Sequence, residues 1–239
     1  DGCGLLLQKP DTFFQSTARE QGWSLGGRYG VGMIFLSRDP EKAEAARIIV
    51  DQELEFDMLT VVGWREVPVD ASACGDQALA TLPRIEQVFV NSPDHLPRGS
   101  FNRKLFLARH RAEKRISDDE TYVASLSSVT ISYKGMVMPD VLAEFYKDLK
   151  DPRLESSVCV FHQRFSTNTL PEWRLAQPFR ARGAVLPRPG RQRGGADRAG
   201  VIGEVVIAKS RSDCGNLIAL DHHVGLQPPR DDKPGHVLR

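Results

Sequence analysis

The chain has 239 residues, 41% of them hydrophobic, which is enough to bury the core of one large domain or two small ones. Its formal net charge of +1 gives no general attraction to nucleic acid or to an anionic membrane. No apolar run approaches the roughly 20 residues needed to cross a bilayer, and the first residues do not resemble a secretion signal. We therefore expect a cytoplasmic protein with no nucleic-acid or membrane partner.

The cysteines and histidines predict no metal site. The four cysteines lie far apart, without a Cys-x-x-Cys pair, which fits reduced thiols in a reducing compartment. They are Cys3, Cys74, Cys159 and Cys214. His222 and His223 form a pair without further ligands nearby in the sequence, and this is a weak metal signal.

The first half of the chain predicts strands and helices in mixed order. Strands are expected at 5–8, 29–36, 59–62 and 85–90, the third ended by Gly63, with a helical turn at 10–14 and a short helix at 75–80. Asp39 before Pro40 has the form of an N-cap with proline in the first helical position. The helix that follows is expected to pack on a sheet through Ala45, Ile48 and Ile49. The glycine-rich stretch 26–30 is interpreted as a hairpin connection and not as a phosphate-binding loop.

The second half predicts a long helix at 101–116, a strand at 128–133 with one buried face, and a helix opened by Pro139. The apolar stripe of the first helix is Leu105, Ala108, Ala112 and Ile116. Five basic residues crowd its remaining surface, which we interpret as a solvated face in preference to a binding patch. They are Arg103, Lys104, Arg111, Lys114 and Arg115. In the helix after Pro139, the residues expected to point inward are Val141, Leu142, Phe145 and Leu149.

The order of these elements indicates the α+β class. Residues 181–239 differ in kind, because they contain no Phe, Trp or Tyr and are rich in Gly, Pro and Arg. Only 201–208 could form a strand there. We expect this tail to be poorly ordered, since it cannot bury enough apolar area to offset its ordering entropy.

The most informative segment follows a predicted apolar strand at 158–161. It reads HQRFSTNT over 162–169, so one arginine, Arg164, stands among hydroxyl side chains at the rim of a core. A guanidinium presents two parallel donors that match a carboxylate. The pattern predicts a carboxylate ligand for Arg164; the alternative is an arginine paired with a structural carboxylate.

The same segment resembles the HSRFSTNT stretch of the glutamine amidotransferase domain of glutamate synthase large subunits, with Gln163 in place of a serine. Four further stretches resemble landmarks of that domain in the same order. They are DGCGLLLQKPDTFF at 1–14, GWREVPVD at 63–70, PRIEQVFV at 83–90 and SLSSVTISYKGM at 125–136. The resemblance implies an N-terminal-nucleophile hydrolase fold, an αββα sandwich, over 1–180. It also implies that Arg164 grips the α-carboxylate of glutamine, with Thr167 beside the ligand and Phe165 and Ser166 as the adjacent wall.

Two parts of the family pattern are missing from the sequence as given. The family begins with a processed cysteine whose α-amino group acts as the base, and it carries a His-Asn-Gly-Glu run soon after a stretch like LAQPFR (175–180 here). We therefore expect an inactive, incomplete domain with no catalytic residue of its own, and a shifted or wrongly joined reading frame at about 180–183. Cys3 as a substitute nucleophile is the alternative to a small buried thiol, and His162 could pair with a thiol or be structural.

As implied by the resemblance, the complete enzyme releases ammonia from glutamine for the reductive amination of 2-oxoglutarate. No cofactor is expected in this segment, and FMN and an iron–sulfur cluster are expected in later domains. The expected partners are glutamine, the remaining synthase domains and a small reductase subunit. Two rival interpretations stay open: a non-catalytic module that binds a ligand or partner, and an RNA-binding role for the arginine-rich tail, which lacks interleaved aromatics for stacking.

Overall fold

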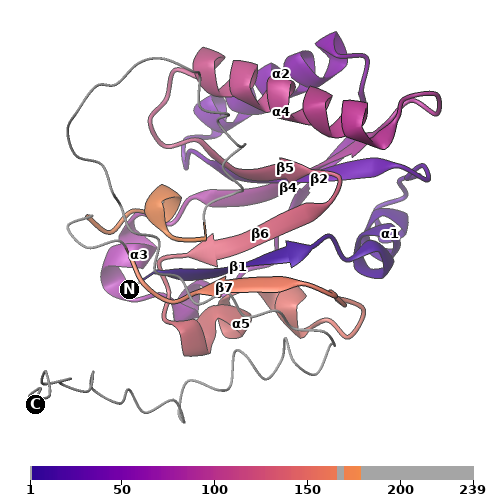
Figure 1. Cartoon of the computed structure of the whole chain (residues 1–239). Helices are drawn as coiled ribbons and strands as arrows, with labels where there is room; N and C mark the ends of the chain where they lie inside the picture. Colours follow the sequence, from indigo (N-terminus) through magenta and orange to yellow (C-terminus); the bar gives the residue numbers. More distant parts are fainter. Residues whose placement is uncertain (1, 166–169, 179–239) are drawn as a thin grey trace, which may run out of the picture.

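The computed structural model describes residues 2–165 and 170–178, in which helices and strands follow one another in mixed order (Figure 1). The strands are β1 (Cys3–Gln8), β2 (Tyr29–Leu36), β3 (Thr60–Glu66), β4 (Arg84–Asn91), β5 (Tyr122–Ser127), β6 (Thr130–Gly135) and β7 (Cys159–His162). The α-helices are α1 (Asp11–Glu20), α2 (Pro40–Phe56), α3 (Asp76–Ala80), α4 (Arg98–Arg115) and α5 (Leu142–Phe145). Short 3₁₀ helices cover Ala71–Ala73, Pro139–Val141, Lys147–Lys150 and Trp173–Leu175. The predicted mixture of helices and strands is confirmed.

The larger sheet is antiparallel, with the strand order β3-β4-β2-β5. All eight residues of β2 are buried. Val31 and Met33 belong to one hydrophobic core, whereas Ile34 and Leu36 belong to another. Because successive side chains point to opposite faces, a strand that is apolar at almost every position is one that is covered on both sides.

The smaller sheet is also antiparallel and has β1 in the middle, in the order β6-β1-β7. Leu5 of β1 faces Tyr133 of β6 on one side and Phe161 of β7 on the other. Directly opposed residues of paired strands point to the same face. These three side chains therefore contribute to one core.

The first core joins the two sheets, since Leu5 and Leu7 of β1 pack in one cluster with Phe89 of β4. Phe13 and Phe14 of α1 complete it. The second core lies between the larger sheet and the helices α2 and α4, which Figure 1 shows together over one face of that sheet. Each large side chain buried in such a core contributes about 1.5–3 kcal/mol. The fold thus has a helical layer, the larger sheet and the smaller sheet in succession.

Helix α2 begins as predicted but buries a different face. Asp39 caps it by accepting a hydrogen bond from the backbone N–H of Glu41 at 2.9 Å. The predicted stripe was wrong, because Ala45 and Ile48 are exposed and Ile49 is only partly buried. The buried face consists of Ala43, Ala46, Val50 and Leu54. Two apolar stripes run along this helix, and packing against both α4 and the sheet selects the stripe with the smaller side chains.

Helix α4 buries Leu105, Ala108 and Ala112, as predicted. Its basic face is not simply solvated. Arg115 donates to the Glu53 carboxylate of α2 at 2.6 Å, and Arg111 donates to Asp57 at 2.7 Å. The charges of α4 therefore help to hold the two helices of the layer side by side.

Strand β3 does not end at Gly63 as predicted; it continues to Glu66. Its register with β4 shifts between Val61 and Gly63, so the irregularity lies within the strand. A side chain at Gly63 would meet the Trp23 ring at 2.4 Å. The glycine is there for close packing and not to stop the strand.

The predicted strand at 128–133 follows another strand after a tight turn, and the two strands belong to different sheets. Strand β5, which the sequence pattern did not predict, ends at Ser127, and the Ser127 hydroxyl accepts the backbone N–H groups of Val129 and Thr130 at 3.0 and 3.3 Å. Residues 128 and 129 form the turn, and β6 follows. Nearly all of β6 is buried, from Ile131 to Gly135. Both faces of the strand are therefore covered, whereas only one buried face was predicted.

Two other local predictions were wrong. The stretch 26–30 is not a hairpin connection; it leads from α1 into β2, which begins at Tyr29. Asn91 accepts a hydrogen bond from the backbone N–H of Gly26 and donates one to the carbonyl of Ser24. The helix after Pro139 is broken at Tyr146, whose backbone is extended and forms a bridge with Val69. A continuous helix would remove this bridge.

Candidate functional site

Arg164 lies just beyond the end of β7 and is exposed to solvent. Its neighbour Phe165 is partly buried and packs against the core between the sheets. Two other predicted binding residues, Ser166 and Thr167, lie outside the described residues. The structure thus places Arg164 and Phe165 together, while the full predicted set is not tested.

Phe165 is held against the beginning of β1. A Cβ atom built on Gly2 would lie 2.4 Å from the Phe165 ring, which is closer than real contacts allow. Only glycine permits this approach. The backbone next to Arg164 is therefore fixed by an aromatic anchor at Gly2, the residue before the central strand of the smaller sheet.

The segment 170–178 returns to the same sheet. Trp173 is buried, and its indole N–H donates to the carbonyl of Ala78 at 3.2 Å. Its ring lies over Gly135, where a Cβ atom would approach to 2.7 Å. Lys134, which has no exposed surface, donates to two carbonyls of this segment. Sequence analysis missed Lys134 and these glycines; the signal available was glycine inside strands, which often marks close approach of another backbone.

A buried polar network lies between the sheets. Arg65 donates to both carboxylate oxygens of Asp148, at 2.7 and 2.8 Å, and to Gln87 at 2.8 Å. The Tyr133 hydroxyl donates to Asp148 at 3.0 Å and accepts from Gln87 at 3.2 Å. Burial raises the pKa of Tyr133 well above its usual value, and the nearby Asp148 charge acts in the same direction. Each of these polar groups has a partner, so the network suits a structural role.

Cys3 and Cys159 are both fully buried in the core between the sheets, which confirms the prediction of buried thiols. His162 is paired with Gly4 across the sheet. Since adjacent residues of β1 point to opposite faces, His162 and Cys3 lie on opposite faces of the smaller sheet. Cys3 is therefore not presented as a nucleophile to a ligand, and His162 is not placed to activate it. His222, His223 and Cys214 lie outside the described residues.

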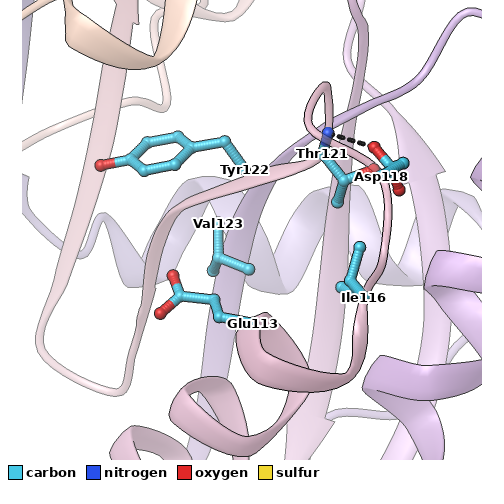
Figure 2. Close-up of a pocket in the computed structure, with 6 residues that line it drawn as sticks. All are labelled: Glu113, Ile116, Asp118, Thr121, Tyr122 and Val123. Atoms are coloured by element: carbon cyan, nitrogen blue, oxygen red, sulfur yellow. Dashed lines mark hydrogen bonds between the residues drawn. The ribbon is translucent and has the colours of Figure 1, made fainter.

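Among the described residues, two of the cavities are lined by side chains other than Arg164. The first, of about 200 Å³, is lined by Glu113, Ile116, Asp118, Thr121, Tyr122 and Val123 (Figure 2). The Asp118 carboxylate accepts a hydrogen bond there from the backbone N–H of Thr121. The Tyr122 ring points away from the turn that holds these two residues (Figure 2).

The second cavity, of about 50 Å³, includes Lys9, Asp11 and Tyr29. Asp11 accepts hydrogen bonds from Lys9 and from the Tyr29 hydroxyl, and burial lowers the pKa of Lys9. The Lys9 amino group is therefore paired with the Asp11 carboxylate within the protein.

Neither a metal cluster nor a membrane span was found in the part of the chain that the structure describes. Within 2–165 and 170–178, three or more His, Cys, Asp or Glu side chains do not gather as a metal-binding group. None of the described helices is both long enough and apolar enough to cross a bilayer.

Comparison with known proteins identifies the family. The model of the class II glutamine amidotransferases matches residues 1–184. Ferredoxin-dependent glutamate synthase 2 of Synechocystis is 42% identical over 185 residues, which cover 77% of this chain and 12% of the relative. The glutamate synthase (NADPH) large chains of Azospirillum brasilense and Bacillus subtilis are 38% and 39% identical, over 75% of this chain and 12% of each relative.

These relatives are much longer proteins. The chain spans about 12% of their length. The stretches that carry the resemblance, including HQRFSTNT, fall within the matched residues. The chain belongs to the class II glutamine amidotransferases.

Proposed function

We propose that this domain is the glutamine-hydrolysing portion of a glutamate synthase large subunit. It supplies ammonia for the reductive amination of 2-oxoglutarate elsewhere in the enzyme. Support comes from the family match over 1–184 and from relatives whose names are those of glutamate synthases. The observation that carries the proposal is the exposed Arg164 just beyond β7, a strand of which Cys159 and Phe161 are buried.

In this proposal Arg164 binds the α-carboxylate of glutamine through two parallel N–H donors. The alternative of a structural ion pair has no support within residues 2–165 and 170–178, where none of the ion pairs includes Arg164. Phe165 forms the apolar wall beside the ligand, and Ser166 and Thr167 supply hydroxyl groups. Arg164 orients the substrate, so that the side-chain amide reaches the nucleophile of the family in a reactive position.

The remaining assignments follow the family. Two antiparallel sheets that share a core, with α2 and α4 on the outer face of one, support an αββα sandwich of the N-terminal-nucleophile hydrolase type over 1–180. We assign 181–239 to a divergent tail. FMN, the iron–sulfur cluster and a small reductase subunit belong to other parts of the enzyme, and the cytoplasmic location stays a prediction.

The test is Arg164→Lys and Arg164→Gln in a full-length synthase that carries this domain. Loss of the bidentate contact costs about 2 kcal/mol, so kcat/KM for glutamine should fall by about 30-fold. Glutamate formation from added ammonium should not change, because ammonium bypasses glutamine binding. Arg103→Gln on the exposed face of α4 is the matched control. Unchanged use of glutamine by both Arg164 variants would refute the proposed role.

A further inference from the structure

Exposed apolar side chains gather where helix α2 ends beside α4. Phe56 is the last residue of α2 and Met58 lies two residues beyond it; they are 75% and 76% exposed. Leu107 of α4 is exposed as well. Single exposed apolar residues are common on protein surfaces, whereas a contiguous group of them marks a site of interaction. We call Phe56, Met58 and Leu107 the α2–α4 patch.

The patch is held together around Asp57, the residue that follows α2. Lys104 donates to the carbonyl of Asp57 at 2.8 Å, and Arg111 donates to its carboxylate at 2.7 Å. The Arg111 guanidinium also lies 5.0 Å from the centre of the Phe56 ring. Leu107 lies one helical turn from each of these two cations, on the same side of α4. The apolar side chains of the patch therefore surround one point and are not scattered.

Met58 has a backbone conformation that a long side chain does not favour. Its φ angle is +60°, and among the residues that the structure describes no other non-glycine residue has a positive φ. The helix ends here with the backbone N–H of Met58 donating to Glu55 at 2.8 Å and that of Leu59 donating to Leu54 at 3.1 Å. Glycine is the usual residue at such a helix end, because it adopts a positive φ without strain. Ending the helix therefore does not explain a large exposed side chain at this position.

The α4 side of the patch presents positive charge to solvent. The carboxylates of α2 that meet the basic residues are nearly buried, with 9% of the Glu53 side chain and 14% of the Asp57 side chain exposed. The cations are more exposed, at 32% for Arg111 and 47% for Arg115. Lys114 is exposed and takes no part in an ion pair between described residues. The patch thus has an apolar centre and, along α4, a cationic border.

This border decides what kind of surface fits the patch. In a symmetric dimer both copies would use the same patch, which brings the cations of one copy close to those of the other and opposes pairing. Nucleic acid would place its phosphates beside an apolar centre that offers them nothing. A protein surface with apolar side chains bordered by carboxylates complements both the centre and the border.

We propose that the α2–α4 patch is the docking surface for another domain of the same synthase, and that this domain presents apolar side chains bordered by carboxylates. The inference rests on the proposed function, because it takes the partner surface from the rest of a glutamate synthase large subunit. Contacts between domains of one polypeptide can be small, since the partner is linked and present at a high effective concentration. A patch of this kind is therefore sufficient.

The first experiment measures the exposure of Met58 directly. Hydrogen peroxide converts exposed methionines to the sulfoxide, and mass spectrometry of peptides gives the rate at each one. The rates are compared between this chain and a full-length synthase that carries it. Met58 should oxidise about tenfold more slowly in the synthase, because docking covers it. Met138, which is also exposed but follows β6, is the control and should keep its rate.

Equal oxidation of Met58 in the chain and in the synthase would overturn the proposal. An equal slowing at Met58 and Met138 would overturn it too, because that reflects general shielding by the larger protein. Met33 and Met136 are buried and should react slowly in both proteins, which confirms that the domain stays folded during the measurement.

Met58→Gly separates docking from folding. It relieves the backbone at a positive φ, so thermal unfolding of the chain should shift upward by about 2 °C. In the synthase the same change should weaken docking and let ammonia escape before it is used. Ammonium released per glutamine consumed should rise about fivefold or more, with glutamine consumption unchanged.

Phe56→Ser should have the same effect on ammonium release. Ile48→Ser is the matched control, since Ile48 is an exposed apolar residue of the same helix but lies two turns before the patch. It should leave ammonium release at the wild-type level. Unchanged release in both Met58→Gly and Phe56→Ser would refute the docking role.

Two measurements on the chain itself test the other occupants. A dimer in sedimentation equilibrium that Met58→Gly converts to a monomer would make a second copy the occupant and overturn the proposal. Retention of a single-stranded RNA of mixed sequence, lost in Lys114→Gln, would overturn it in favour of nucleic acid. A monomer that does not retain this RNA supports the assignment to a protein domain.

The outcomes separate this inference from the proposed function. If Arg164→Gln leaves glutamine use unchanged while Met58 is protected in the synthase, the role of Arg164 is wrong and the docking surface stands. If Arg164→Gln impairs glutamine use while Met58 oxidises equally in both proteins, the docking surface is wrong and the function stands. Impaired glutamine use in Arg164→Gln, together with protection of Met58 and ammonium escape in Met58→Gly, supports both.

Discussion

Replacing Asp148 by asparagine should destabilise the protein strongly, because it removes one charge from a buried bidentate ion pair. Asp148 accepts from Arg65 at 2.7 and 2.8 Å, and the two side chains are 2% and 12% exposed. Tyr133 adds a third hydrogen bond to the same carboxylate at 3.0 Å. The asparagine amide keeps the shape but turns an N–H₂ group toward guanidinium or hydroxyl donors.

Breaking a buried pair in this way costs about 3–5 kcal/mol, since the remaining charge is left in a poorly solvated place. Domains of this kind are stable by about 5–15 kcal/mol in total, so the loss is a large fraction of the whole. Arg65→Met together with Asp148→Leu removes both charges. That double variant should be more stable than Asp148→Asn alone.

The assay is urea unfolding followed by circular dichroism, with the midpoint and slope fitted for each variant. Lys150→Gln serves as the control, because Lys150 pairs with Glu144 at the surface, where both side chains are more than half exposed. It should cost about 0–1 kcal/mol. A loss in unfolding free energy below about 1 kcal/mol for Asp148→Asn would show that the Arg65–Asp148 ion pair does not act as a buried, stabilising pair.

Two further predictions concern the helical layer and strand β3. Hydrogen bonds from Arg115 lower the pKa of Glu53, although burial acts in the opposite direction. The ionised carboxylate therefore stabilises the fold at pH values above the unfolded-state pKa of about 4.3. This contribution is lost as the pH falls through the folded-state pKa. Glu53→Gln should thus be less stable than wild type in urea at pH 7, with the difference shrinking toward pH 3; a constant difference would contradict the ion-pair explanation. Gly63→Ala should cost about 1–3 kcal/mol in thermal unfolding, because its Cβ would meet the Trp23 ring at 2.4 Å. Gly27→Ala, with open space around it, is the control, and equal costs for the two would refute the packing argument.

Several elements could be predicted from the sequence because their signals are local. The Asp39-Pro40 cap, the apolar stripe of α4 and the uninterrupted apolar run of β2 each depend on a few neighbouring residues. The arginine segment was found in the same way, from its residue types and its place after a predicted apolar strand. Where two local patterns competed, as on α2, the sequence offered no means of choosing.

The predictions that failed involve partners far away in the chain. Tyr146 interrupts the helix after Pro139 because it bridges to Val69 and donates to the carbonyl of Lys134. Strand β5 has weak alternation, yet it forms because β2 pairs with it along one edge. Long-range contacts of this kind outweigh local propensity, which amounts to less than about 1 kcal/mol per residue.

The sequence by itself determined the family and the mixed α and β composition, and it singled out Arg164 as a candidate, because motifs and periodicity are properties of neighbouring residues. The tertiary structure alone decided how the 170–178 segment is held on the smaller sheet. Lys134 reads as an ordinary strand-end lysine in the sequence; only folding buries it and brings its amino group to the carbonyls of Arg174 and Ala176. The physical reason is that burial and hydrogen-bond pairing depend on residues forty positions away, which meet only when β6 and the 170–178 segment have packed together.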